Sequence, residues 1–122
     1  MAVQRKVEND TLCLYEDSTE ILSIMESAEG NDVLLKLSGM LRSDVAHDFQ
    51  DELVALATLH MNLILDMADI TYISSTCQQV LLAVQQKIDE LGQSSMRIKN
   101  MPANLKTEFD NTGFSQLLDI EE

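Results

Sequence analysis

The chain has 122 residues, of which 45% are hydrophobic and 4% aromatic, so it can form one domain whose core is filled by aliphatic side chains. Its 21 acidic and 8 basic side chains give a formal net charge of −13, which repels phosphate backbones and anionic membrane surfaces and argues against nucleic acid as a partner. No apolar run approaches the roughly 20 residues needed to cross a bilayer, so direct membrane insertion is not expected.

The charge and the cysteines favour a protein that contacts other proteins in the cytoplasm. Residues 1–10 are polar and contain no apolar signal-peptide region, so we expect a flexible N-terminus before a domain of residues 11–122. Cys13 and Cys77 have no metal-binding or redox spacing. The acidic charge has two equally good explanations. It can be a coat that only keeps the chain in solution, or it can attract a basic partner.

The first elements along the chain are predicted to be strands. Apolar and polar residues alternate over Thr11–Tyr15, which is typical of a short strand. Ile21–Ala28 is interpreted as a second strand, with a helical turn as the alternative. Turn-forming residues at 29–32 then lead into a third strand, Val33–Leu37, and Gly39 is expected to end it.

A first helix is predicted to follow, from Ser43 to about Leu59. Ser43 is a good N-cap, because its hydroxyl can accept a backbone N–H of the first turn. The apolar stripe that defines this helix consists of Val45, Phe49, Leu53 and Leu56.

The stretch that follows combines a buried strand with a second helix. Leu63–Leu65 is an apolar run too short for a helix and typical of a strand buried on both faces. Asp66–Thr71 is interpreted as a polar bend. Apolar residues then recur at spacings of three and four, which predicts a helix over Ser75–Leu91 that Gly92 terminates.

The C-terminal part is predicted to contain one more strand and one more helix. In Ser95–Asn100, apolar side chains alternate with basic ones. Pro102 suits the first turn of a helix that carries Leu105 and Phe109. A last apolar segment, residues 114–120, is expected to close the core as a short helix or strand. Successive strand–helix–strand crossovers predict a small α/β domain with a mixed, mostly parallel sheet covered by helices.

Catalytic, metal and cofactor motifs are missing from the sequence. Its two histidines, His47 and His60, belong to no nucleophile motif, and no cysteines cluster with them. The glycine-rich loops that bind phosphates of nucleotides are absent as well. We therefore expect a protein that is not an enzyme and that holds neither a metal nor a cofactor.

The feature that suggests function is the run of hydroxyls Ser74, Ser75 and Thr76, where a strand-derived loop becomes a helix. A serine there can simply be an N-cap. Alternatively it can be phosphorylated, because backbone N–H groups without partners and the helix dipole favour negative charge at a helix N-terminus. The sequence leaves both interpretations open.

At this point the chain resembles STAS domains, the fold of bacterial anti-sigma factor antagonists. The resemblance covers Val33–Ile120 and depends on three segments: VLLKLSGML (Val33–Leu41), LILDMADITYISST (Leu63–Thr76) and LKTEFDNTGFSQLLDI (Leu105–Ile120). It implies one STAS-like α/β domain.

In that family, a serine at the start of the second helix, within a D-S-[SA]-G-like motif, is phosphorylated by an anti-sigma factor with serine kinase activity, and a phosphatase reverses the modification. The resemblance implies that Ser74 is this serine, with Ser75 and Thr76 as alternatives. Aligned in this way, Ile73 and Thr76 stand where the motif has Asp and Gly, and Arg42 stands where the family often has Asp. The residues expected to bind the partner are Arg42, Asp69, Tyr72, Ile73, Ser74, Ser75 and Thr76.

Two hypotheses about function follow. In the first, the chain is a non-enzymatic antagonist-like regulator that switches partners when the serine at the second helix is phosphorylated. In the second, it is an unphosphorylated STAS-type binding module, such as a scaffold or an accessory subunit of a signalling or lipid-transport complex. The Ser74–Ser75 pair favours the first hypothesis, whereas Ile73 and Thr76 favour the second.

Overall fold

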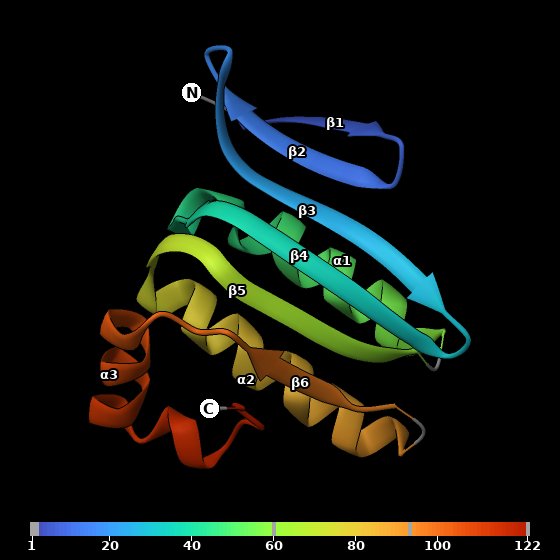
Figure 1. Cartoon of the computed structure of the whole chain (residues 1–122), viewed down its shortest axis with the longest axis vertical. Coiled ribbons are helices and arrows are strands. Elements are labelled where there is room, and N and C mark those ends of the chain that lie inside the picture. The colour runs from blue at the N-terminus through green and yellow to red at the C-terminus, as the bar shows by residue number, and fades with distance from the viewer. Residues whose placement is uncertain (1–2, 60, 93, 122) are drawn as a thin grey trace.

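A sheet with its strands in sequence order forms the frame of the domain (Figure 1). The computed structural model describes residues 3–59, 61–92 and 94–121. The elements in chain order are β1 (Gln4–Glu8), β2 (Thr11–Glu16), β3 (Thr19–Glu29), β4 (Asp32–Leu41), η1 (Ser43–Val45), α1 (Ala46–Thr58), β5 (Asn62–Ile73), α2 (Ser75–Leu91), β6 (Met96–Lys99), α3 (Ala103–Thr112) and η2 (Phe114–Gln116).

The sheet is mixed, as predicted, but it is not mostly parallel, because the parallel pairs are confined to one end. Strands β1 to β4 pair antiparallel, whereas β4 with β5 and β5 with β6 pair parallel. The two parallel connections run through α1 and α2, which lie side by side on the same face of the sheet (Figure 1). This arrangement is the one that right-handed crossovers produce.

The core lies between this face and the two helices. Alternate side chains of the strands point toward α1 and α2, and the apolar stripes of both helices meet them. Helix α2 has the predicted bounds, with Gly92 in the left-handed conformation at its C-terminus. The largest fully buried side chains are Phe49, Phe109, Leu14, Leu22, Ile24, Leu35, Leu37, Leu41, Leu53, Leu63, Leu65 and Met67.

Strand β1 was missed by the sequence analysis, which took residues 1–10 for a flexible segment. All five of its residues are exposed, so no apolar alternation marks it. It pairs along its whole length with β2. On the helix side, Arg5 lies 3.8 Å from Asp48 and 3.7 Å from Glu52 of α1. Backbone pairing and these charge contacts therefore hold the strand, and Val3 just before it packs partly buried against the core.

The predicted bend at Asp66–Thr71 is wrong, because β5 continues through it to Ile73. The pairing of β5 with β4 shifts register within this stretch, so that Met67 and Ile70 both remain buried. Asp66 Oδ1 accepts the N–H of Ala68 at 3.1 Å and Asn100 Nδ2–H at 3.2 Å, which satisfies the polar residue that suggested a turn.

Gly39 does not end β4 as expected, and the strand runs on to Leu41. Its φ of +115° is accessible to glycine and strained for other residues, and a Cβ at this position would lie 2.1 Å from the carbonyl oxygen of Ile21. The close approach of β3 and β4 therefore requires glycine here. Ser43 also differs from expectation, because it begins the short η1 turn and Val45 takes the N-cap position of α1.

The C-terminal segment closes the other edge of the sheet. Ile98 donates its N–H to the carbonyl of Asp119, and Glu121 donates to the carbonyl of Ile98. Ile120 thereby forms a parallel bridge with Ile98, next to the short η2 turn. Among the described helices, none is long and apolar enough to span a membrane.

A carboxylate at the sheet–helix interface connects folding to pH. Glu26 of β3 is half-buried beside Glu52 of α1, and its Oε1 atom is buried without a hydrogen-bond partner among the described residues. Burial, and then the neighbouring carboxylates of Glu52 and Asp10, raise the pKa of Glu26 to about 7. Since its ordinary pKa is 4.5, the folded state holds a proton here that the unfolded chain releases. The stabilisation that the protonated Glu26 contributes to the folded state is therefore fully present below about pH 4.5 and is lost as the pH rises to about 7.

We predict that Gly39→Ala lowers the free energy of unfolding by at least about 3 kcal/mol, because it adds both a clash with Ile21 and a strained φ. Gly30→Ala is the matched control: Gly30 also has a positive φ, of +62°, but a Cβ there meets no atom within 4 Å. It should cost only about 1 kcal/mol. Urea unfolding measures both values, and equal losses would contradict the proposed contact.

We predict that Glu26→Gln stabilises the protein at pH 8 by about 1 kcal/mol, a value reduced for the solvent screening of a half-buried group. The gain should vanish toward pH 4.5, where the parent carboxyl is protonated too. Thermal melting across this pH range tests it. Glu29→Gln, at an exposed position of the same strand, removes the same charge and should give a profile parallel to that of the parent. A constant gain for Glu26→Gln at all pH values would contradict the raised pKa.

Candidate protein-docking site

The hydroxyl cluster lies where β5 passes into α2, next to the end of β4. Ser74 is the N-cap of α2, in an extended conformation, and its Oγ accepts the N–H of Cys77 at 3.1 Å. Its own N–H donates to the carbonyl of Leu41 at 2.8 Å, and its carbonyl accepts the N–H of Gln78 at 3.0 Å. Each polar group of Ser74 therefore has a partner, and the residue is only 4% exposed.

Ser75 and Thr76, in the first turn of α2, are exposed instead. The first turn contains no acidic residue, so no side chain of the helix offsets its positive end. Thr76 Oγ1 accepts the hydroxyl of Ser43 at 3.5 Å, a contact that joins α2 to the segment after β4. The cluster thus separates into one buried structural hydroxyl and two accessible ones.

Cys77 holds the same turn against the end of β4. Its Sγ donates to the carbonyl of Arg42 at 3.4 Å, and burial raises the pKa of its thiol. The thiol is therefore protonated and acts as a small hydrogen-bonding core group rather than as a nucleophile.

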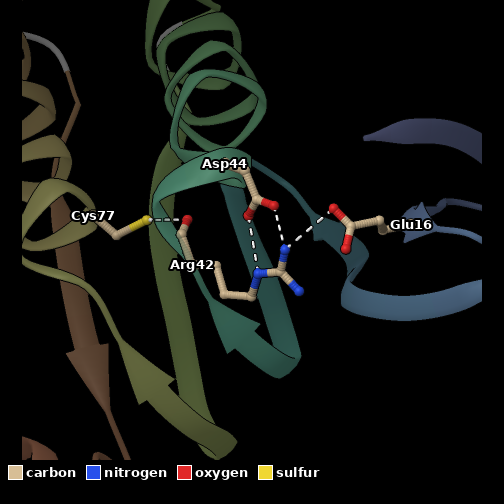
Figure 2. Close-up of polar contacts among 4 residues, drawn as sticks. All are labelled: Glu16, Arg42, Asp44 and Cys77. Carbon is tan, nitrogen blue, oxygen red and sulfur yellow. Dashed lines mark hydrogen bonds and ion pairs between the residues drawn. The ribbon is translucent and has the colours of Figure 1, made fainter. Parts of the chain in front are cut away.

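Arg42, which was predicted to bind the partner, is already engaged within the chain. Its Nε donates to Asp44 Oδ1 at 3.1 Å, its Nη2 contacts Asp44 Oδ2, and the same Nη2 lies 3.4 Å from Glu16 Oε2 (Figure 2). Figure 2 also shows the guanidinium directed toward Glu16 and away from Cys77. The charge of Arg42 therefore connects β2 with the β4–α1 segment.

The remaining predicted residues divide by burial. Ile73 is 2% exposed and belongs to the core, whereas Tyr72 is 48% exposed. Asp69 is exposed and lies 4.0 Å from Lys36. We call Tyr72, Ser75, Thr76 and the adjoining Ser43 the α2 docking surface.

Two further residues, Met40 and Gln78, also border this region, and neither was among those predicted to bind the partner. Met40, the cross-strand partner of Tyr72, is 36% exposed. Gln78 is buried, and its Nε2 donates to Glu108 Oε2 of α3 at 3.4 Å. No sequence signal identified them, because a methionine in a strand or a glutamine in a helix is ordinary.

The arrangement offers groups that suit protein binding. In the described part of the chain, no group of three or more His, Cys, Asp or Glu side chains could hold a metal ion. His47 lies exposed on α1, 3.2 Å from Asp51 on the same helix, and His60 is outside the described residues. What the α2 docking surface offers is hydroxyls, an aromatic side chain and the N-terminus of a helix.

Comparison with known proteins agrees with this architecture. Solved structures with the same fold include the anti-sigma factor antagonist SpoIIAA in its unphosphorylated form, with a TM-score of 0.68 at 10% identity over 81% of this chain and 88% of that one. An anti-sigma factor antagonist from Mycobacterium paratuberculosis gives 0.71 at 12% identity over 81% and 84%. The phosphorylated form of the Bacillus cell fate determinant SpoIIAA gives 0.62 at 10% identity over 81% and 91%. At these identities the likeness shows the fold alone.

Sequence comparison defines the family. Among curated protein sequences, none matches this chain. The family model described as "Mlab, STAS domain" matches residues 24–119, which extend from β3 past the η2 turn. Because this match covers most of the chain and the fold agrees with it, the chain belongs to the STAS domain family.

Proposed function

We propose that this STAS domain is a non-enzymatic regulator that binds a partner protein through the α2 docking surface, and that phosphorylation of Ser75 controls this binding. The observation that carries the proposal is the pair of exposed hydroxyls, Ser75 and Thr76, in the first turn of a helix whose first turn contains no acidic residue. The proposed partners are those of anti-sigma factor antagonists: an anti-sigma factor with serine kinase activity and an opposing phosphatase, acting in the cytoplasm.

The choice of Ser75 depends on the capping geometry. Asp and Ser are equivalent as N-caps, because each side chain offers an oxygen to a backbone N–H of the first turn. Ser74, the observed N-cap, can therefore take the place of the motif's Asp, and its own hydroxyl is buried and already accepts the N–H of Cys77, whereas the hydroxyl of Ser75 is exposed. In this register the phosphorylated Ser of the motif corresponds to Ser75. The phosphorylation of Ser74 implied by the resemblance stays a prediction, and the test below separates the two sites.

A phosphate on Ser75 would change the charge of the docking surface without unfolding it. It adds about −1.5 to −2 charges and three acceptor oxygens. The free N–H groups and the dipole of α2 stabilise such a charge within the domain. A partner that packs against the uncharged turn would lose contacts, because it would have to bury the new charge.

We predict that incubation of the purified protein with ATP and an extract of its source cells places phosphate on Ser75. Ser75→Ala should abolish the modification. Ser74→Ala should retain it while lowering the free energy of unfolding by about 1 kcal/mol, the value of a lost N-cap. Phosphopeptide mass spectrometry and urea unfolding provide the two measurements. Phosphate on Ser74 that persists in Ser75→Ala would contradict the proposed register.

A second candidate function is a constitutive binding module, such as a scaffold or an accessory subunit of a signalling or lipid-transport complex. The contacts Ser43–Thr76 and Cys77–Arg42 favour it, since they hold the first turn of α2 rigidly and make it a preformed surface. If the chain is such a module, Ser75→Asp leaves partner binding unchanged. If phosphorylation of Ser75 controls binding, the same substitution abolishes it.

Both candidates predict the same location for the partner. Thr76→Arg should weaken capture of the partner at least about tenfold, because it places a long charged side chain in the centre of the α2 docking surface. Gln86→Arg is the matched control, since it makes the same change of charge at an exposed position farther along α2. Titration of the immobilised variants with the isolated partner gives the affinities. Equal weakening by the two variants would mean that charge, and not position, governs binding.

A further inference from the structure

One face of the sheet is uncovered. Both α1 and α2 lie behind the sheet in Figure 1, and within the described residues no helix packs against its front face. Parallel strands are normally covered on both faces. Here the parallel strands β4 and β5 nevertheless direct Leu34 and Ile64 outward, and both are only half-buried. We call this side of the sheet the open face.

The open face contains further apolar side chains besides Leu34 and Ile64. Met25 is 53% exposed, Met40 36% and Tyr72 48%. A shallow hollow of about 250 Å³ adjoins the two aliphatic residues, and it is lined by Ser27, Glu29, Asp32, Leu34, Ile64 and Lys99.

Charge on the open face is locally balanced, in contrast to the net charge of −13 for the whole chain. Asp66 of β5 is the cross-strand partner of Lys36 on one side and of Lys99 on the other. Lys36 also lies 4.0 Å from Asp69. Two such acidic chains repel one another over most of their surface. This face, where cations and anions alternate, is the one on which that repulsion is compensated.

The register of β4 and β5 makes the open face complementary to itself. Leu34 is the partner of Ile64, Lys36 of Asp66, and Met40 of Tyr72. A two-fold axis parallel to the strands, between β4 and β5, places β4 of each copy over β5 of the other in the same register. Leu34 then faces Ile64, Met40 faces Tyr72 and each Lys36 faces an Asp66, whereas Met25 of β3 faces Lys99 of β6.

We propose that the open face binds a second copy of this chain, in a face-to-face dimer with its two-fold axis between β4 and β5. Face-to-face sheets pack about 10 Å apart with their strands nearly aligned. The residues of β4 and β5, the two strands beside the axis, therefore stay in register with those of the other copy. The central contacts are Leu34 with Ile64 and Lys36 with Asp66, once on each side of the axis.

Exchange of charge between the two strands tests this geometry. Lys36→Asp alone brings two pairs of carboxylates together across the axis, and Asp66→Lys alone brings two pairs of ammonium groups together. Each variant should dimerise at least about tenfold more weakly than the parent. An equimolar mixture should form a heterodimer as tight as the parent dimer, because the new carboxylate at position 36 then meets the new ammonium at position 66.

Native mass spectrometry distinguishes the heterodimer by mass, and sedimentation velocity over a concentration series gives the affinities.

Since Asp66 also accepts hydrogen bonds within the chain, Leu34→Asp and Ile64→Lys form a second pair with the same logic. Leu59→Asp, at a 69% exposed position after α1, is the control and should leave the dimer intact. A parent that stays monomeric at every concentration, single variants that dimerise as the parent does, or a mixture no tighter than its components would each overturn the proposal. These measurements use the chain alone, without a partner, so they do not depend on partner binding, although Tyr72 belongs to both surfaces.

Discussion

The hydrogen bond from the N–H of Cys77 to the hydroxyl of Ser74 determines how α2 leaves the sheet. A helix begins with backbone N–H groups that have no partner within it, and a buried helix start without a cap is costly. Ser74 supplies the cap while its own N–H stays bonded to Leu41 at the end of β4. The end of one strand, the end of its parallel neighbour and the start of the helix are thereby joined at one residue.

This constraint explains why neighbouring hydroxyls have different roles. The residue that caps the helix must face inward, so Ser74 is buried and its oxygen is occupied. The next two residues belong to the first turn, whose outer side faces solvent, so the side chains of Ser75 and Thr76 are exposed. Regulation by phosphate fits this division, because a modified Ser75 does not require the cap to open. The Arg42–Asp44–Glu16 contacts strengthen the frame around the turn and leave the hydroxyls as its accessible polar groups.

A feature of the structure could be predicted from the sequence when its signal lies in neighbouring residues. It could not be predicted when it depends on segments that are distant in the chain. The bounds of α2 followed from its apolar spacing and from Gly92, which are local signals. The course of β5 did not, because polar Asp66 and Asp69 resemble a turn until the register shifts against β4 are known. Gly39 was taken for a strand end, since the approach of Ile21 that requires it comes from a distant segment. Strand β1 is held by pairing and by Arg5, neither of which produces a hydrophobic pattern. At the site, the sequence located the hydroxyls correctly at the helix start, but only the structure shows which of them is the cap.

The two surfaces of the domain then have different characters. The α2 docking surface is small and rich in hydroxyls, whereas the open face is broad, partly apolar and matched to itself through the register of β4 and β5, and the two surfaces meet at Tyr72. The different roles of the hydroxyls depend on Ser74 acting as the structural cap. Amide hydrogen exchange at Cys77, followed by NMR, tests this capping role most directly. We expect this amide to exchange slowly in the parent and in Ser75→Ala, and several-fold faster in Ser74→Ala, in line with the loss of a cap. A Cys77 amide that exchanges at the same rate in all three proteins would contradict the capping role, and with it the assignment of Ser75 as the regulated hydroxyl.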